Sequence, residues 1–305
     1  MPNSASPYLR AFGKRELFLY ACTVFAWSAS WYALKVNMST GIPAPVSTTW
    51  RFVIAAFCMF VWARLSGAPL VFPLRRQQQF AALGVLLFST NFILFYVASQ
   101  YVVSGLLAVV FSLASIINLA IAALRGESSP GSRWFGAALG VAGIALLYSK
   151  ELESGVTATT GLALCVGGTL CFCFGNLVSQ ALQREQIPVL SASAWGMSWG
   201  ALWSACLAGA FGYAFEFDVS IEYIGSLVFL VFIATLLAFW AYLNLIGRIG
   251  AGRAAYATVM FPIGALLLST IVENWQWSAE AVGGVALALI DNVLVLRGGV
   301  SAKPT

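Results

Sequence analysis

The chain of 305 residues contains no histidine, and only 9% of its residues are charged. A soluble globular domain has about 25% charged residues, so this sequence cannot build a water-exposed surface of ordinary composition. Apolar residues make up 60% of the chain, which indicates a protein that lies mostly in lipid. The six cysteines are scattered through apolar stretches, and Cys171 and Cys173 point to different faces of a helix. We therefore expect no metal site, no disulfide and no cofactor.

The missing residue types also argue against several functions. Without histidine and without paired acids inside the apolar stretches, the sequence offers neither a nucleophile with its base nor a set of metal ligands. We expect no enzymatic activity. The usual carboxylate or imidazole relay of a proton-coupled pump is missing too, which favours facilitated diffusion or exchange. A cation in a low-dielectric cavity requires a buried carboxylate, so neutral or zwitterionic substrates fit better than cationic drugs.

Apolar stretches as long as membrane-spanning helices account for most of the chain. We expect spans at 16–35, 45–65, 77–99, 101–123, 133–150, 159–183, 190–212, 223–246, 251–272 and 277–296. In lipid only helices and closed barrels satisfy their backbone hydrogen bonds, and these stretches are too long for barrel strands. The predicted fold class is all-α, a polytopic membrane protein with ten transmembrane helices.

Basic residues gather on the side of the membrane that holds both termini. Of the 16 lysines and arginines, only Lys35 and Lys150 lie at the opposite ends of the spans, and Arg51 lies within one. The positive-inside rule then places both termini in the cytoplasm. Short loops fit a multi-pass protein of a bacterial inner membrane. The net charge of +5 is spread over many loops, so we expect contact with lipid headgroups and no nucleic-acid partner.

The two halves of the chain match each other at a nearly constant offset. Ile42, Pro43 and Trp50 recur as Ile187, Pro188 and Trp195, and Tyr96 and Glu127 recur as Tyr242 and Glu273. We therefore expect a cytoplasmic segment at 1–15, one five-helix repeat at 16–150, a second at 159–296 and a cytoplasmic tail at 297–305. Because five is odd, the copies are inverted, which is typical of secondary transporters that work by alternating access. A channel or a membrane scaffold is the alternative of another class.

Four groups of residues carry a family resemblance. They are Trp27, Ser28 and Lys35; Arg51, Phe52, Ala55 and Ala56; Met260 to Ala265 with Glu273; and Gly283 with Gly284. In this order they resemble the drug/metabolite transporter superfamily, EamA type, although Ile116 stands where the family often has proline. The resemblance covers essentially the whole chain. It implies that the first, third, fourth, sixth, eighth and ninth spans line a central cavity.

Within that superfamily the chain is most similar to bacterial amino-acid exporters, including those for aromatic amino acids. The resemblance thus implies a small-molecule substrate, an amino acid or a similar amphipathic metabolite, that moves outward through the bilayer. Drugs or nucleotide sugars are the alternative substrates. The sequence predicts no oligomeric state.

Two ionisable residues fall inside predicted spans, where charge marks a candidate functional group. Arg51 lies six residues beyond Pro45, about 9 Å into the second span. It can either extend to the membrane surface or face the cavity and meet a carboxylate. Asp291 lies near the end of the last span, where we expect it to reach headgroup water or Arg297.

Uncharged polar and aromatic residues supply the predicted substrate site. The fourth span has a stripe of Ser104, Ala108, Phe111, Ser115 and Asn118, and the sixth has Thr169, Cys173, Asn176, Gln180 and Gln183. Such stripes either join helices or line a wet pathway. We expect the substrate to be bound by Trp27, Asn91, Phe111, Ser115, Asn118, Asn176, Gln180 and Asn244.

Two matched tyrosines and a row of glycines complete the predictions. Tyr96 and Tyr242 are expected to belong to opposing gates, and the alternative is that both are interfacial anchors. Gly136, Gly140 and Gly143 are spaced by four and three residues, which predicts close helix packing.

Overall fold

The computed structural model describes residues 13–126, 128, 130–153, 156–249, 254 and 257–299, and this part of the chain is helical without any strand. Its elements are α1 (Lys14–Ser39), α2 (Ala44–Leu65), α3 (Leu74–Val85), η2 (Leu86–Thr90), α4 (Asn91–Ala98), α5 (Ser104–Phe111), α6 (Ala114–Leu124), α7 (Gly131–Glu153), α8 (Val156–Arg184), α9 (Val189–Ala210), α10 (Ile221–Val228), η3 (Phe229–Leu237), α11 (Ala238–Ile249), α13 (Ala257–Val272) and α14 (Ala279–Gly299). The all-α prediction is confirmed. Every predicted span coincides with a helix or a run of helices, although the beginning of the ninth span and Glu127 lie outside the described residues.

Length and composition allow six of these helices or runs to cross a membrane. They are Lys14–Ser39, Ala44–Leu65, Leu74–Ala98, Ser104–Leu124, Ala158–Arg184 and Ile221–Tyr242. Each has at least 18 residues with few charges, and about 20 residues span the hydrocarbon core of a bilayer. Gly131–Leu147 and Val259–Val272 are shorter apolar helices.

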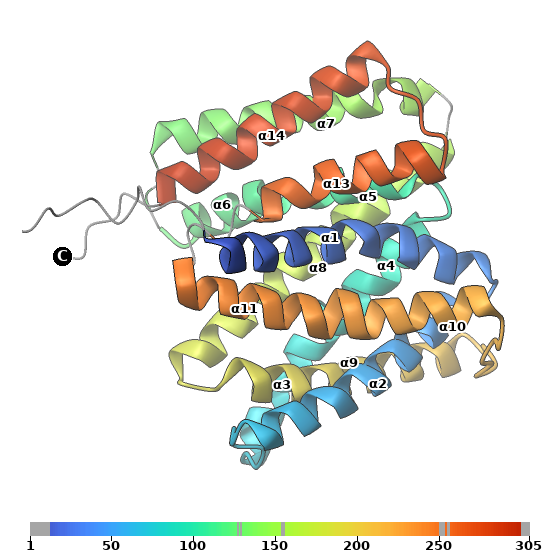
Figure 1. The fold of residues 1–305 in the computed structure, drawn as a ribbon, viewed down its shortest axis with the longest axis vertical. Helices are drawn as coiled ribbons and strands as arrows, with labels where there is room; N and C mark the ends of the chain where they lie inside the picture. The colour runs from blue at the N-terminus through green and yellow to red at the C-terminus, as the bar shows by residue number, and fades with distance from the viewer. Residues whose placement is uncertain are drawn as a thin grey trace, which may run out of the picture.

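Most helices run in roughly the same direction, while α4 and α8 cross obliquely behind α1 and α11 (Figure 1). α7 and α14 form one edge, α2, α3 and α9 form the other, and α1, α4 and α8 lie between them. Helices from the two halves of the chain pack as pairs: α7 with α14, α2 with α9, α5 with α13, α1 with α11, and α4 with α8. We call the end where α1 begins and α14 ends the terminal end, and the opposite end the distal end.

Three segments depart from regular α-helix. The Ser112 and Leu113 amides donate to Val109 O and Val110 O, each at 3.0 Å, and this tighter turn separates α5 from α6. The segments η2 and η3 are π-helical, a rare conformation that concentrates at functional sites. The predicted polar stripe of the fourth span assumed one continuous helix, so the break divides its residues between two helices.

Glycines bring α7 and α14 into backbone contact. A Cβ on Gly143 would lie 2.6 Å from the carbonyl oxygen of Gly284, and a Cβ on Gly140 would overlap the carboxylate of Asp291. A Cβ on Gly136 would touch Leu294 at 3.0 Å. The predicted close packing at these three glycines is confirmed, and van der Waals contact between small residues is what holds helices together in lipid.

Gly284→Val is therefore expected to loosen this pair and lower stability by about 1–3 kcal/mol, the usual cost of overpacking. The readout is the apparent melting temperature of the purified protein in detergent. Gly209→Val on α9 is the matched control, because a Cβ there would meet nothing within 4 Å. An equal loss in both variants would contradict the packing role of Gly284.

Candidate functional site

Aromatic rings from six helices meet inside the bundle. This aromatic cluster consists of Trp27 and Trp31 (α1), Phe95 (α4), Phe111 (α5), Phe172 (α8), Tyr242 (α11) and Phe261 (α13). Ring centroids are 5.0 Å apart for Trp27 and Tyr242 and 4.6 Å for Phe111 and Phe172. These helices belong to the six spans that the family resemblance assigned to the cavity. The cluster therefore joins both halves of the chain at one place.

The local structure of α1 and α13 positions two of these rings. Ser28 donates a hydrogen bond from Oγ to the carbonyl oxygen of Phe261 at 2.9 Å. Pro262 lies within α13 and supplies no backbone donor, and Gly264 leaves room for Ser28, because a Cβ there would overlap its hydroxyl. The two helices thus approach closely at the level of Trp27. Phe261 is buried, whereas Trp27 is only half-buried and keeps part of its indole accessible.

Arg51 lies deep in the bundle rather than at the membrane surface. Its side chain is 4% exposed, and the guanidinium lies 4.3 Å from the ring centroid of Phe92 and 5.3 Å from that of Phe52. Nη2 donates to Thr235 Oγ1 at 3.5 Å, while Nε and Nη1 have no hydrogen-bond partner. The Tyr96 hydroxyl also lies close enough to interact with the guanidinium, although the contact does not have the geometry of a regular hydrogen bond. The predicted alternative of extension to the surface is wrong.

A second polar group lies at the distal end and joins α1, α5 and α13. This distal cluster consists of Lys35, Ser104, Ser269 and Glu273. Lys35 Nζ pairs with Glu273 Oε1 at 2.6 Å, and the Ser104 amide donates to Oε2 at 3.0 Å. Both serine hydroxyls also contact the carboxylate. The carboxylate thus sits at the first turn of α5, where the helix dipole favours negative charge.

The distal cluster keeps its charge over the physiological pH range. Burial by itself raises the pKa of Glu273, but hydrogen bonds from Lys35, Ser104 and Ser269 lower it by more, so that the pKa lies below its ordinary value of 4.5. A carboxylate with a depressed pKa contributes stability above its ordinary pKa and loses it only as the pH falls through the lower value. The ion pair is therefore expected to persist unchanged between about pH 5 and 8.

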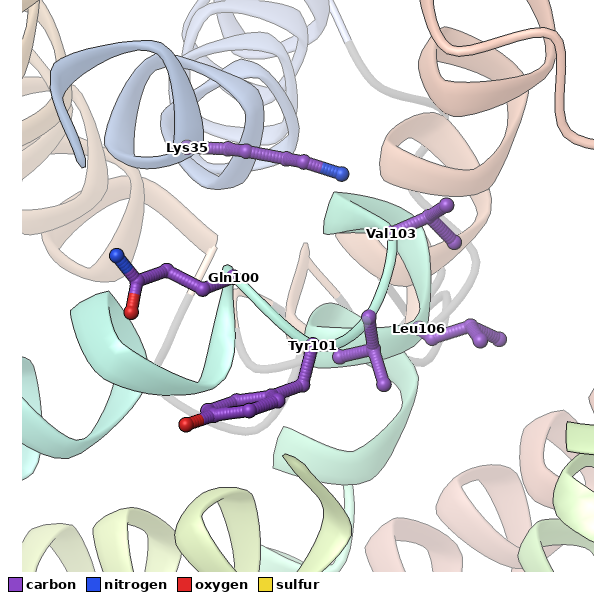
Figure 2. A pocket seen from close by; sticks show the side chains of 6 residues that line it. Lys35, Gln100, Tyr101, Val103 and Leu106 are labelled. Atoms are coloured by element: carbon purple, nitrogen blue, oxygen red, sulfur yellow. The ribbon is translucent and has the colours of Figure 1, made fainter. Parts of the chain in front are cut away.

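A pocket of about 170 Å³ opens beside the distal cluster. Figure 2 shows the Lys35 side chain extending along one side of this pocket, with Tyr101 on the opposite side. Gln100, Val102, Val103 and Leu106 complete its lining. A solute that crossed the bundle and left at this end would meet Lys35 there.

Two ion pairs tie helices together at the terminal end. Arg248 Nη1 pairs with Glu16 Oε1 at 3.1 Å and joins α11 to α1. Arg76 pairs with Glu185, just beyond α8, and so connects α3 to it. Charged contacts between helices of different halves therefore occur at both ends of the bundle.

Asp291 is buried between α14 and α7, which differs from its expected position. It was expected to reach headgroup water or Arg297, but its side chain is 1% exposed and packs against Gly136 and Gly140 of α7. Oδ2 lies 3.5 Å from Ser115 Oγ, and Oδ1 has no hydrogen-bond partner. The glycines of α7 allow α14 to approach so closely that the carboxylate is covered.

The remaining predicted site residues are dispersed. Asn91 is buried at the start of α4, and its Oδ1 has no hydrogen-bond partner. Asn176 is half-buried, whereas Asn118 and Gln180 are exposed. Asn244 donates to the carbonyl oxygen of Trp240 in its own helix at 2.8 Å. The structure thus brings only Trp27, Phe111 and Tyr242 of the predicted residues into the aromatic cluster.

Four members of the aromatic cluster were not predicted as site residues. Trp31 follows Trp27 by four residues, so helical spacing could have indicated it. Phe172 lies 145 residues after Trp27, which is the offset between the repeats. Phe261 lies in the segment Met260 to Ala265 that carries the family resemblance, which could have indicated it. Phe95 carried no comparable signal among the many apolar residues of its span.

The predicted gate residues occupy different surroundings. Tyr96 is fully buried in α4, and its hydroxyl has no hydrogen-bond partner. An interfacial anchor has its polar tip in water, so this alternative is wrong for Tyr96. Tyr242 packs with its ring against Trp27 in the aromatic cluster.

Comparisons with known proteins agree with this architecture. Residues 14–149 match the EamA-like transporter family. The "Uncharacterized inner membrane transporter YedA" of Escherichia coli K12 is 25% identical over 271 residues, covering 87% of this chain and 86% of the relative. The "Probable amino-acid metabolite efflux pump" of Salmonella typhimurium LT2 is 21% identical over 295 residues, covering 93% of each. A solved crystal structure has the same fold, with a TM-score of 0.64 at 15% identity over 92% of this chain and 96% of that one.

The family match covers the first half of the chain, and the relatives align over both halves. Together with the long apolar helices, these matches show that the chain contains an EamA-like transporter domain over residues 14–149 and is similar over most of its length to membrane transporters.

Proposed function

We propose that this chain is a secondary transporter that moves small amphipathic metabolites, foremost amino acids including aromatic ones, out across a bacterial inner membrane. The observation that carries this proposal is the aromatic cluster, because helices from both halves of the chain build it. Rings such as Trp27 and Phe111 offer stacking surfaces to a flat apolar side chain. The efflux pump and the inner membrane transporter among the relatives support the direction and the compartment.

Alternating access between two inverted five-helix repeats is the mechanism that we infer. Matched helices pack against each other across the halves, as α2 does with α9 and α7 with α14. Adding the repeat offset of 146 to η2 (Leu86–Thr90) gives 232–236, which lies inside η3 (Phe229–Leu237). Both repeats therefore carry a π-helical segment at the same position. This agreement supports ten spans in two inverted copies, with both termini in the cytoplasm.

Gating would then involve both ends of the bundle. The distal cluster holds α1 to α5 and α13, while the Glu16–Arg248 pair holds α1 to α11 at the terminal end. Tyr96 lies toward the distal end of α4, and Tyr242 lies beside Trp27 in α11. We propose these tyrosines as parts of opposing gates, with Asn91, Asn118, Asn176, Gln180, Ser115 and Asn244 as candidate polar contacts of the solute.

Exchange without a proton relay remains the proposed mode. The buried carboxylate of Asp291 weakens the argument from missing acids, but it lies between α14 and α7, outside the aromatic cluster. A proton bound to Asp291 would therefore not contact a solute held in the aromatic cluster.

Counterflow in proteoliposomes tests the transport function. Vesicles loaded with unlabelled L-phenylalanine are expected to accumulate labelled L-phenylalanine with saturable kinetics and without a pH gradient. A panel of further amino acids, a cationic dye and a nucleotide sugar then defines the substrate class. Conductance that does not saturate would instead indicate a channel. Unchanged rates in both Tyr96→Phe and Tyr242→Phe would end the assignment of these residues to gates.

A further inference from the structure

Arg51 is a buried guanidinium whose hydrogen-bonding capacity is largely unused. A guanidinium carries five N–H donors, yet only Nη2 has a hydrogen bond of regular geometry, the long contact of 3.5 Å to Thr235 Oγ1. Its Nε and Nη1 are buried without a partner. Removing a charge from water costs several kcal/mol in proteins, and buried charges are normally paired. The guanidinium therefore has unused donors that an anionic group of a solute can engage.

In the part of the chain that the structure describes, no acidic side chain pairs with Arg51. Lys35 pairs with Glu273, Arg76 with Glu185 and Arg248 with Glu16. The neighbours of Arg51 on α2, α4 and η3 are the rings of Phe52 and Phe92, the hydroxyl of Tyr96 and that of Thr235. Ring faces stabilise a buried cation only in part.

The position of Arg51 connects it to the aromatic cluster through α4. Phe92 and Tyr96 face Arg51, while Phe95 of the same helix packs against Trp31 with ring centroids 5.0 Å apart. α4 directly follows the π-helical η2, and Thr235 belongs to the π-helical η3, where its hydroxyl donates to Leu230 O five residues back. A π-helical segment therefore adjoins α4, the helix whose side chains face both the guanidinium and the aromatic cluster, and a second one contacts Arg51 directly.

We propose that Arg51 binds the carboxylate of the transported solute, which makes carboxylate-bearing amphipathic compounds the substrate class. The guanidinium fork matches the geometry of a carboxylate and can hold it with two parallel hydrogen bonds. The apolar part of the solute then rests against the aromatic cluster. This inference rests on the proposed transport function and adds the chemical group by which the solute is selected.

The test is equilibrium binding of two probes that differ in one group, 3-phenylpropionate and 3-phenylpropanamide. Each is titrated against the purified full-length protein in detergent, with intrinsic tryptophan fluorescence as the readout. We expect the wild type to bind the carboxylate at least tenfold more tightly than the amide. Arg51→Met should reduce this preference to less than twofold, and Arg51→Lys, which keeps the charge without the fork, should retain part of it.

Arg64→Met is the matched control, because this arginine lies in the same helix and is exposed. It should keep the wild-type preference. A wild type that responds equally to both probes, or to neither, overturns the proposal, and so does an Arg51→Met variant that still prefers the carboxylate. If Arg51→Met does not fold, the proposal is judged on the preference of the wild type for the carboxylate over the amide and on the loss of part of that preference in Arg51→Lys. Saturable counterflow of amino acids in proteoliposomes with no carboxylate preference would leave the transport function standing while removing the role of Arg51.

Discussion

Glu273→Gln is expected to open the distal end of the bundle. The substitution keeps the shape of the side chain but removes the charge that pairs with Lys35 at 2.6 Å and faces the first turn of α5. Because Lys35 is 34% exposed, solvent screening limits the pair to about 1–2 kcal/mol. A change of that size shifts an equilibrium by about 5–30-fold. The ratio of the closed to the open arrangement of α1, α5 and α13 should fall by that factor.

A cysteine at Leu106 reports this change, since Leu106 lines the distal pocket but is only 2% exposed. In Leu106→Cys protein, modification by a maleimide is followed by mass spectrometry of the labelled peptide. Glu273→Gln should speed the labelling at least fivefold relative to the parent protein at the same pH. This ratio should be the same at pH 6 and pH 8, because the pKa of Glu273 in the parent lies below 4.5 and the ionisation of the cysteine thiol changes alike in both proteins. Glu222→Gln is the control, as Glu222 is exposed at the start of α10. Labelling at the parent rate in Glu273→Gln would rule out a closing role for the distal cluster.

Trp27→Ala should have the second large effect, on the selectivity of transport. The indole contacts Tyr242 at 5.0 Å and Phe261 at 6.3 Å between ring centroids. Aromatic pairs contribute about 0.5–1.5 kcal/mol each, and 1.4 kcal/mol is a tenfold change in affinity. If a solute ring takes part in these contacts, the apparent KM for L-phenylalanine should rise at least tenfold in counterflow. The apparent KM for L-alanine should change by less than threefold, because its methyl group cannot stack.

Two further variants separate this role from a loss of folding. Trp27→Phe keeps a ring at the position and should retain most of the preference for L-phenylalanine. Trp203→Ala removes a tryptophan that is 41% exposed on α9, and it should behave like the wild type. The assignment of Trp27 to the substrate site fails if both substrates are affected equally or if Trp203→Ala gives the same result.

The positions of the helices could be predicted because they depend on a local property. A run of apolar residues must lie in lipid or in the core wherever it is in the chain, and its length decides whether it can cross the membrane. The predicted spans accordingly coincide with helical elements of the structure. The glycine spacing on α7 was informative for the same reason, since residues three and four apart share one face of a helix.

The placement of Ser115 and Asp291 could not be predicted in this way. The turn at Ser112 and Leu113 separates α6 from α5, so Ser115 faces Asp291 of α14 at 3.5 Å and does not continue the face of Phe111. The burial of Asp291 follows from the approach of α7, which no pattern within α14 reveals.

The sequence by itself determined that the chain is a helical membrane protein, where its helices lie along the chain, and which family it resembles. These features depend on the length of each apolar run and on the spacing of residues within a single helix. Only the tertiary structure decided which side chains meet. Lys35 pairs with Glu273 across 238 positions of sequence, and Arg51 lies beside Thr235 across 184. Such contacts depend on how helices pack against each other, and that packing is set by shape complementarity between distant segments.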